Sequence, residues 1–359
     1  MSRHWMGGEG MSRAAKLGIS LAAAAVAALV VGGTLLIARH GAKHPAVAQS
    51  PGPTFTGTPS ASPSPSPKPS PRPTATPANC SNAPHLCGFP DATNSGVPAK
   101  TRKKLLSVPG QVSSGPGWHY DPGGWVEVDG NGAVLKGLSI PYNVDVTASH
   151  VTIEDDVIVN TGDSFGVSIR HSHDVTVKDC DISSPHADSR RLMVGVKDVY
   201  GDATGTKVIG NNIWHTATGV QISAGLIAGN YIHSVGFKPG DHVNGITVNG
   251  STRPLTIRHN TVFVNLAQTD AISLFEDFGV EANKLIKDNL IAGGGYSIYG
   301  GAKSGGPQSY NIRIIGNRFS RKYYSNGGQF GPAAYFSSGP GNVWSGNIWD
   351  GTKAVVPSP

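Results

Sequence analysis

Two basic residues and one histidine have the types and spacing that proton transfer on a charged sugar would require. Arg170 and Lys197 each end a short segment in which apolar and polar residues alternate, and His242 lies in the loop Pro239–Ile246. If the two segments are strands on adjacent coils, the two cations become neighbours that neutralise a carboxylate beside a base. The alternative is that both cations are solvated on an exposed strand and that His242 only hydrogen-bonds its own loop.

Four carboxylates near the ends of neighbouring predicted strands suggest two further kinds of chemistry: Asp241, Asp270, Glu276 and Asp277. Hydrolysis of a glycosidic bond requires two carboxylates on opposite sides of that bond, roughly 5 to 9.5 Å apart. A lyase would instead use Asp241 and Asp270 with Asn244 to hold Ca²⁺, which prefers oxygen ligands. Both alternatives stay open, because spacing along the chain does not determine these distances.

The elements that must position these residues are short segments with an apolar residue at every second position: Gly166–Arg170, Met193–Lys197, Gly219–Ser223, Gly245–Asn249, Ala271–Phe275 and Tyr296–Tyr299. A strand presents alternate residues on one face, and stacked strands lie about 4.8 Å apart. The outward positions therefore form a surface along which a chain of sugars can lie. The predicted substrate-binding residues on or beside this surface are Gln221, Thr247, Asn249, Phe275, Glu276 and Tyr299.

A second pattern repeats between these segments, and it defines the fold. The octet Leu255–Val262 has apolar residues at its first, third and eighth positions and Asn at its sixth, and related octets return at intervals of roughly 18 to 32 residues. Their sixth positions are Asp156, Cys180, Asn212, Asn230, Asn260, Asn289, Asn317 and Asn347. Alternating Val and Ile favour strands, and repeats of this length are typical of solenoids. The sequence therefore predicts an all-β protein, a right-handed parallel β-helix with two or more strands per coil.

The recurrent Asn has a structural explanation that does not involve catalysis. Asn tolerates the left-handed backbone conformation of a bend between two strands. Asn side chains stacked from coil to coil can also hydrogen-bond one another as a ladder. Cys180 takes a ladder position, so we expect a buried free thiol there.

The N-terminal part of the chain predicts a membrane anchor followed by a spacer. Residues 1–16 are expected to be cytoplasmic, because their basic residues precede an uncharged apolar run at 17–38 that is long enough to span a bilayer. Residues 39–79 are rich in Pro, Ser and Thr and predict a disordered linker, and residues 80–355 form the β-helix domain. The alternative is a signal peptide cleaved near Ala46–Ala48, which would release a secreted protein. In both cases we expect a monomeric domain outside the cytoplasmic membrane.

Charge and cysteine content separate the domain from this N-terminal part. Seven basic residues and one acidic residue precede Cys80, which accounts for the whole formal net charge of +6. The domain is therefore close to neutral, and it contains no recognised nucleic-acid-binding motif, so we expect no nucleic-acid partner.

Cys80 and Cys87 predict a disulfide, because no further Cys or clustered His completes a metal site.

The segment Cys87–Pro98, with the sequence CGFPDATNSGVP, resembles the opening of a group of secreted right-handed β-helix proteins that is common in actinobacteria. This group belongs to the pectate-lyase-like superfamily, and the resemblance continues through DFG at 277–279 and GGGYSIY at 293–299 to about Asp350. We expect the turn-forming residues of the opening segment to cover the first coil. The superfamily includes lyases, epimerases, glycoside hydrolases and non-catalytic adhesins, so the chemistry must be argued from the site.

Four positions differ from the motifs of that group. The loop before one strand resembles the motif H-x-D-G-I-Q, but Asn244 replaces its Asp and Thr247 replaces its Gln. One coil earlier, where relatives have G-D-G-[LV]-K, Thr218 replaces the Asp and Gln221 replaces the Lys. The leading hypothesis is a polysaccharide lyase-like enzyme, or a related enzyme such as a glycoside hydrolase, that acts on or binds an acidic polysaccharide. Ca²⁺ is the candidate cofactor. The alternative is a non-catalytic cell-wall polysaccharide-binding or adhesive module, which the predicted spacer and the replaced residues favour.

Overall fold

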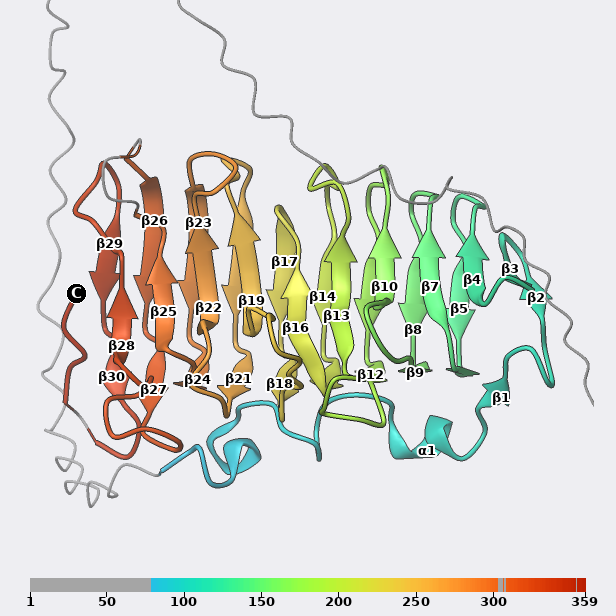
Figure 1. The fold of residues 1–359 in the computed structure, drawn as a ribbon, viewed down its shortest axis with the longest axis horizontal. Helices are drawn as coiled ribbons and strands as arrows, with labels where there is room; N and C mark the ends of the chain where they lie inside the picture. Colours follow the sequence, from blue (N-terminus) through green and yellow to red (C-terminus); the bar gives the residue numbers. More distant parts are fainter. Residues whose placement is uncertain (1–78, 303–305, 307, 353) are drawn as a thin grey trace, which may run out of the picture. The chain divides into compact units, whose positions relative to one another are not determined.

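The computed structural model describes residues 79–302, 306, 308–352 and 354–359. The predicted cytoplasmic segment (1–16), the predicted membrane span (17–38) and all of the predicted linker except Asn79 lie outside the described residues. Within the described part of the chain, no helix has the length and apolarity needed to cross a membrane. The described residues form a stack of short strands that coincides with the predicted domain (Figure 1).

Three sheets run along this stack, and their strands are parallel except at the N-terminal end. Sheet A contains β1 (Leu106–Ser107), β6 (Leu138–Ile140), β9 (Val157–Val159), β12 (Asp181–Ser183), β15 (Asn212–Trp214), β18 (Tyr231–His233), β21 (Thr261–Val264), β24 (Leu290–Gly293), β27 (Arg318–Ser320) and β30 (Ile348–Trp349). Sheet B contains β2 (Ser114–Gly115), β3 (Trp118–Asp121), β4 (Trp125–Val128), β7 (Asn143–Val146), β10 (Phe165–Ile169), β13 (Leu192–Asp198), β16 (Thr216–Gln221), β19 (Asn244–Asn249), β22 (Asp270–Phe275), β25 (Tyr296–Gly300) and β28 (Gly331–Ala334). Sheet C contains β5 (Val134–Lys136), β8 (Thr152–Glu154), β11 (Thr176–Lys178), β14 (Lys207–Ile209), β17 (Gly225–Ala228), β20 (Leu255–Arg258), β23 (Ala282–Lys287), β26 (Tyr310–Ile315) and β29 (Val343–Ser345).

Each complete coil contributes one strand to each sheet. The chain passes from sheet C to sheet A around a sharp bend, continues to sheet B through a loop, and returns to sheet C. The octet Leu255–Val262 shows the bend, because β20 ends at Arg258 and β21 begins at Thr261. The prediction of a parallel β-solenoid with two or more strands per coil is confirmed, and the number is three.

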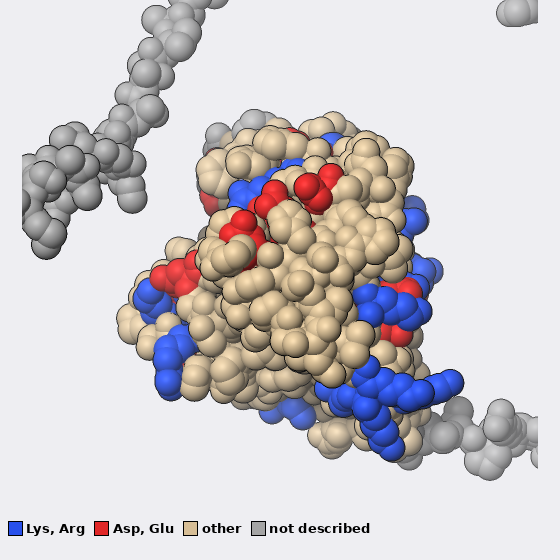
Figure 2. All heavy atoms as spheres, turned by 90° about the vertical axis from the view of Figure 1, so that its right-hand side faces the viewer, with Lys and Arg blue, Asp and Glu red and all other residues tan. Residues whose placement is uncertain are grey.

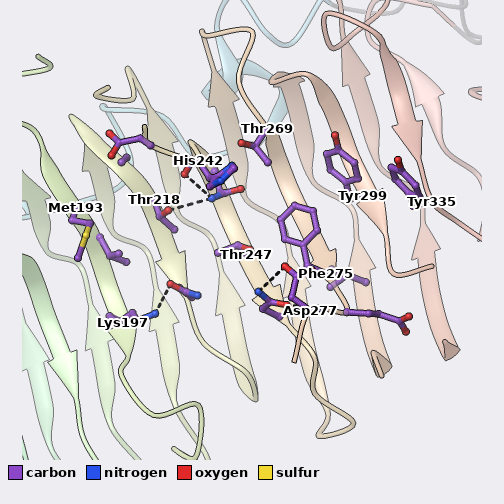
Figure 3. A pocket seen from close by; sticks show the side chains of 18 of the residues that line it. Met193, Lys197, Thr218, His242, Thr247, Thr269, Phe275, Asp277, Tyr299 and Tyr335 are labelled. Carbon is purple, nitrogen blue, oxygen red and sulfur yellow. Dashed lines mark hydrogen bonds between the residues drawn. The ribbon is translucent and has the colours of Figure 1, made fainter. Parts of the chain in front are cut away.

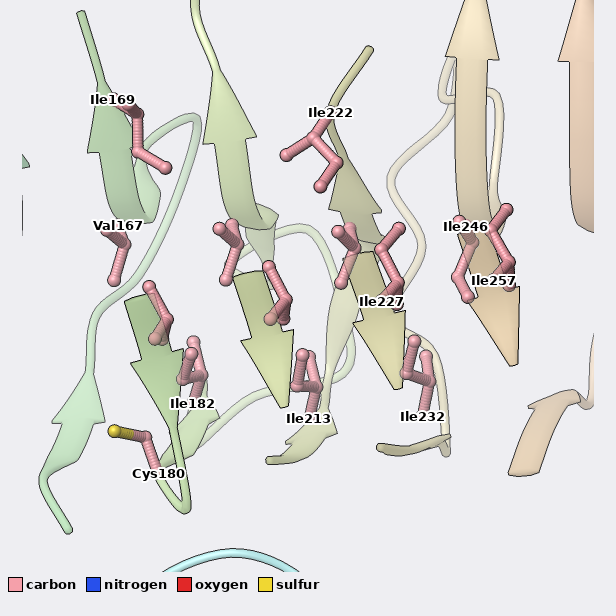
Figure 4. Packing of buried hydrophobic residues seen from close by; sticks show 14 of the residues in the cluster. Val167, Ile169, Cys180, Ile182, Ile213, Ile222, Ile227, Ile232, Ile246 and Ile257 are labelled. Atoms are coloured by element: carbon pink, nitrogen blue, oxygen red, sulfur yellow. The ribbon is translucent and has the colours of Figure 1, made fainter. Parts of the chain in front are cut away.

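Val and Ile fill the inside of the stack in columns. The sheet B column is in register and fully buried: Val167, Val196, Val220, Ile246, Ile272 and Ile298. Figure 4 shows members of this column facing Ile213 and Ile232 of sheet A and Ile227 of sheet C. Each such side chain stabilises the stack by about 1.5 to 3 kcal/mol relative to exposure. Cys180 is buried among them as a free thiol, as predicted.

A ladder of hydrogen-bonded side chains follows the bend between sheets C and A, as predicted. Its Asn residues are fully buried: Asn211, Asn230, Asn260, Asn289, Asn317 and Asn347. At each step, Oδ1 accepts the backbone N–H of the ladder residue one coil earlier, as between Asn260 and Asn289 at 2.9 Å. The amide Nδ2 donates to a backbone carbonyl, as from Asn289 to Ile257 at 3.0 Å. The ladder therefore satisfies backbone groups that have no access to water.

Two details of the predicted ladder are wrong. The residue in the coil after Cys180 is Asn211, whose Oδ1 accepts the Cys180 N–H at 2.9 Å, and Asn212 is a half-buried residue of β15. Two adjacent Asn residues had made the octet ambiguous by one position. The left-handed conformation also belongs to the residue before Asn, such as Gly229 (φ 67°) and His259 (φ 56°). Asn is selected here for its hydrogen bonds and not for its backbone conformation.

The N-terminal segment of the domain runs along the outside of the stack, and the expectation that it covers the first coil is wrong. The predicted disulfide joins Cys80 and Cys87 at the start of this segment, beside the 3₁₀ helix η1 (Pro84–Cys87). The Cys80 N–H donates to Asp350 in the last coil at 2.9 Å, and the segment continues past the middle coils to α1 (Ala99–Arg102). The first coil is covered instead by β2, β3 and β4, which pair antiparallel.

Candidate functional site

A groove of about 760 Å³ lies over the outward face of sheet B (Figure 3). Its floor comes from β13, β16, β19, β22 and β25, which are consecutive strands. The loop that leads into β19 lines it with Gly240, Asp241 and His242, and residues after β22 line it with Glu276 and Asp277. Five strands extend for about 19 Å at the usual spacing, which suits several units of a linear polymer.

One column of sheet B runs along the floor, with its members in register on adjacent strands: Ser168, Lys197, Gln221, Thr247, Ser273 and Tyr299. Four members of this column line the groove: Lys197, Gln221, Thr247 and Tyr299. The six residues predicted to bind substrate all line the groove: Gln221, Thr247, Asn249, Phe275, Glu276 and Tyr299. Their location agrees with the alternation in the sequence, and their role in binding stays a prediction.

Lys197 is half-buried in the floor, and its Nζ donates a hydrogen bond to Oε1 of Gln221 at 2.6 Å. Burial lowers the pKa of Lys197 from its ordinary value of 10.5, and the charge of Asp198 opposes this shift. A lower pKa increases the fraction of neutral amine at a given pH, and the neutral amine is the form that accepts a proton. Lys197 is therefore the candidate base of the groove.

The predicted basic pair of Arg170 and Lys197 is not formed. Register places Ser168, and not Arg170, beside Lys197. Arg170 lies two positions further along, where its Nε donates to Oδ1 of Asp145 at 2.7 Å, and it is not among the described residues that line the groove. Alternation predicts the face on which a residue lies, but the register between two strands depends on the length of the loop that joins them.

Asp241 lines the groove, but a buried arginine neutralises it. The Nε of Arg191 donates to Oδ2 of Asp241 at 2.8 Å, and Nη2 of Arg191 donates to Oδ1, which makes the pair bidentate. The remaining Nη1 of Arg191 donates to Asp163 at 2.7 Å. Because both oxygens of Asp241 are engaged, its carboxylate positions the loop that carries His242. Sequence analysis did not assign Arg191 a role, because it follows a polar loop that resembles an ordinary solvated turn.

Asp270 lies beneath the floor of the groove and is fully buried. Burial raises the pKa of Asp270 well above its ordinary value, which favours the protonated form of its carboxyl group. Asn244 lies beside it on β19, where Nδ2 donates to the carbonyl of His242 at 2.9 Å. The predicted Ca²⁺ ligands Asp241, Asn244 and Asp270 do not form one open site among the described residues, because both oxygens of Asp241 are paired with Arg191 and Asp270 does not line the groove.

His242 lies exposed at the edge of the groove, and no other described residue hydrogen-bonds its ring. Its solvated position is compatible with proton exchange with water. Two carboxylates lie beyond the end of β22. Glu276 is 9% exposed and accepts the Glu281 N–H through Oε1 at 3.1 Å, and the Asp277 N–H donates to Oδ1 of Asn249 at 2.9 Å.

Three aromatic rings lie together at the C-terminal end of the groove (Figure 3). The ring centroids of Phe275 and Tyr299 are 5.2 Å apart, and those of Tyr299 and Tyr335 are 5.4 Å apart with an interplanar angle of 18°. Such faces offer apolar surface for the C–H groups of a sugar ring. Tyr335 was not predicted, because β28 before it lacks the Val and Ile alternation that identifies the other strands.

The charges of the groove do not by themselves select a polyanion. Among the described lining residues, Lys197 is the one Lys or Arg, whereas Asp241, Glu276 and Asp277 are carboxylates. The sequence from Cys80 onward contains 22 basic and 22 acidic residues. Figure 2 shows small groups of both signs among uncharged residues at the N-terminal end of the stack. A ligand must therefore be held mainly by hydrogen bonds and aromatic contacts, with one cation available for a single negative group.

A comparison with protein-family models agrees with this architecture. A family model described as a right handed beta helix region matches residues 126–284. A search of solved structures found the crystal structure of pectate lyase Pel9A, with 14% sequence identity and a TM-score of 0.33 over 61% of this chain. The match covers 56% of the length of the pectate lyase, so this chain spans about half of that protein. No curated protein matched the sequence significantly.

Proposed function

We propose that this right-handed parallel β-helix of the pectate-lyase-like fold is a carbohydrate-active protein that binds a polysaccharide along the sheet B groove and cleaves it by β-elimination at a uronic acid unit. The observation that carries this proposal is the position of Lys197. Its half-buried amine, with a lowered pKa, lies in a groove that continues over consecutive coils to Tyr299 and Tyr335. The candidate base and the aromatic side chains proposed to bind sugars therefore lie along the same groove.

The reaction assigns a balanced proton transfer to Lys197. Its neutral amine accepts the proton on the carbon next to the uronate carboxylate, and the electrons of that C–H bond form a C=C bond. The glycosidic C–O bond on the adjacent carbon breaks at the same time, and the leaving oxygen takes a proton from water or from protonated His242 at the groove edge. The resulting ammonium of Lys197 then neutralises the carboxylate of the unsaturated product.

A second candidate function is non-catalytic binding of a cell-wall polysaccharide. It is favoured by the pairing of Asp241 with Arg191 and by the burial of Asp270. Both observations make two of the predicted carboxylates unsuitable for hydrolysis. Independently of them, the described lining holds no Lys or Arg besides Lys197 that could neutralise a uronate carboxylate. The aromatic end of the groove would still hold a sugar chain.

A panel of polysaccharides distinguishes these functions. Pectate, alginate, a glycosaminoglycan and neutral glucans are each incubated with the protein, and ultraviolet absorbance, new reducing ends and the melting midpoint are measured. β-Elimination yields an absorbing unsaturated product that is lost in Lys197→Ala. The matched control is Lys207→Ala, because Lys207 is exposed on β14 of sheet C.

The other outcomes decide between the remaining possibilities. New reducing ends without absorbance indicate hydrolysis and contradict the role of Lys197 as an eliminating base. A raised melting midpoint without either product supports the binding module. If no polymer is cleaved or raises the melting midpoint, both proposals fail.

We also infer that the domain is displayed outside the cytoplasmic membrane, with secretion after cleavage as the alternative. The basic residues before the apolar run at 17–38 and the disulfide between Cys80 and Cys87 support this location. Protease added to intact cells should release the domain by cutting between residues 45 and 79, because the Pro-, Ser- and Thr-rich sequence there predicts an accessible spacer. Complete protection would contradict the orientation, and domain found in the medium before protease treatment would favour cleavage.

A further inference from the structure

Two neighbouring turns place two histidines and one aspartate together, away from the groove. His150 lies in the turn between β7 and β8, and His173 and Asp174 lie in the turn between β10 and β11, one coil later. All three are exposed, and none of them lines the groove. Each offers one ligand atom, and these atoms all lie within 4.8 Å of one another.

The distances between these side chains suit a small cation. Nδ1 of His150 lies 3.3 Å from Oδ2 of Asp174. Two ligands of a tetrahedral Zn²⁺, each about 2.0 to 2.1 Å from the metal, would lie about 3.4 Å apart. Nδ1 of His173 lies 2.8 Å from Oγ of Ser149, so a proton on Nδ1 can be donated to Ser149 and leaves Nε2 for a metal.

The backbone at these turns sets the two coils apart from their neighbours. His150 and Asp174 occupy equivalent positions in adjacent coils, and both have a left-handed backbone conformation, with φ of 59° and 55°. In the next coil on either side, the equivalent residue is a glycine, Gly132 or Gly205, which is also left-handed. A residue with a Cβ atom is disfavoured there by about 1 to 2 kcal/mol. The two turns are also tied together, since the His150 N–H donates to the His173 carbonyl at 2.9 Å. Two side chains that can ligate a metal thus replace glycine in adjacent coils, on a fixed scaffold.

We propose that His150, His173 and Asp174 bind a divalent transition metal ion, with Zn²⁺ as the preferred ion. Two imidazoles and one carboxylate match the ligand preference of Zn²⁺, and water takes the fourth position. Ser149 is a positioning residue that orients the ring of His173. The bound ion would join two coils near the N-terminal end of the stack and would stabilise them in proportion to its occupancy.

To test this proposal, the full chain is first freed of metal by a chelator. Zn²⁺ binding is then measured by calorimetry, and Co²⁺ binding is measured by visible absorption. Tetrahedral Co²⁺ is expected to give intense visible bands for one ion per chain, and Zn²⁺ should remove them and raise the melting midpoint. His150→Gly and Asp174→Gly should lose this ion while keeping the fold, because glycine already takes this position in the neighbouring coils. Ser149→Ala should weaken binding about 10- to 100-fold.

His171→Ala is the matched control and should bind as tightly as the unchanged protein. His171 lies two residues from the site, but its Nδ1 lies 2.6 Å from Asp202 and its ring stacks on Tyr200. A second group, His119, Asp121 and Glu127, also offers ligands, so the stoichiometry is compared between variants. The proposal would be overturned if Co²⁺ gave no tetrahedral spectrum. It would also be overturned if His150→Gly and Asp174→Gly bound the ion with an unchanged spectrum and affinity, provided that the metal-free variants melt like the unchanged protein.

Discussion

Two columns of side chains follow the stack from coil to coil, and they follow opposite rules. The ladder between sheets C and A holds Asn in successive coils from Asn211 to Asn347, all fully buried. The floor of the groove changes at every step, as from Lys197 to Gln221 to Thr247. The ladder has one task, which is to satisfy buried backbone groups, so one residue type serves every coil. The floor faces solvent and ligand, so each coil can present a different group.

The ladder itself changes at its N-terminal end, where Asp156 takes the Asn position. Its Oδ1 accepts the Leu138 N–H at 2.7 Å, while its buried Oδ2 has no hydrogen-bond partner among the described residues. Burial raises the pKa of Asp156 to about 8. A protonated carboxyl resembles the Asn amide in shape and can donate as well as accept, so the protonated form of Asp156 suits the buried Asn position, while its Oδ1 accepts the Leu138 N–H in either protonation state. In this solenoid, a residue type that repeats in every coil therefore marks a structural position. A coil that departs from the repeat, as at Asp156, marks a position with its own chemical behaviour.

The largest effect should come from interrupting the ladder. Asn289→Leu removes the acceptor of the Asn260 N–H and the donor to the Ile257 carbonyl, both of which are buried. We expect the free energy of unfolding to fall by about 2 to 4 kcal/mol in denaturant titrations. The control is Asn212→Ala, because this half-buried Asn lies on β15 outside the ladder, with its Oδ1 3.0 Å from Nε2 of His233. Equal losses in the two variants would refute the distinction between Asn residues inside and outside the ladder.

A smaller, pH-dependent effect is expected at Asp156. Its folded pKa of about 8 exceeds the ordinary value of 3.8, so the folded chain binds one more proton than the unfolded chain between these pH values. The contribution of Asp156 to the free energy of unfolding therefore falls as pH rises towards 8. Asp156→Asn should remove this dependence and stabilise the protein by about 1 to 3 kcal/mol at pH 7.5. Parallel stability curves for both proteins between pH 5 and 8 would contradict the raised pKa.

Cleavage by the groove should depend on pH through Lys197. The base acts in its neutral form, so the rate of β-elimination should rise by about tenfold per pH unit and level off at the pKa of Lys197. Because burial lowers this pKa, the plateau should begin below the ordinary value of 10.5. A rate that is lost in His242→Ala and unchanged in Lys197→Ala would assign the base to His242 instead. The measurement is initial absorbance change against pH on the polymer found in the panel.

The smallest effect is expected at the aromatic end of the groove. Tyr335 is 55% exposed and stacks on Tyr299, so Tyr335→Ala should weaken polysaccharide binding by about 0.5 to 1.5 kcal/mol without changing the melting midpoint of the free protein. Tyr310→Ala is the control, because Tyr310 is an exposed Tyr on β26 of sheet C. Affinity that is unchanged in Tyr335→Ala, or lost equally in both variants, would remove the ring from the binding surface.

Apolar alternation in the sequence was sufficient to predict the solenoid, most of its strands and the face on which their side chains lie. Alternation of apolar residues is a local property with a period of two, so it is visible within five or six residues. The ladder was visible for the same reason, since one buried position must meet the same requirement in every coil. Even the error at Asn212 was local, because its neighbour Asn211 offered the same side chain one position earlier.

The tertiary structure was needed to show which outward residues are neighbours and which charged groups remain available to a ligand. Arg170 and Lys197 lie on the same sheet, but the chain between β10 and β13 shifts their register and leaves Arg170 with Asp145. Asp241 is neutralised by Arg191, a residue 50 positions earlier in the chain. Contacts across such separations depend on loop length and on packing, and the free energy of a charge depends on its burial. Neither quantity is encoded in the local alternation that specifies the strands.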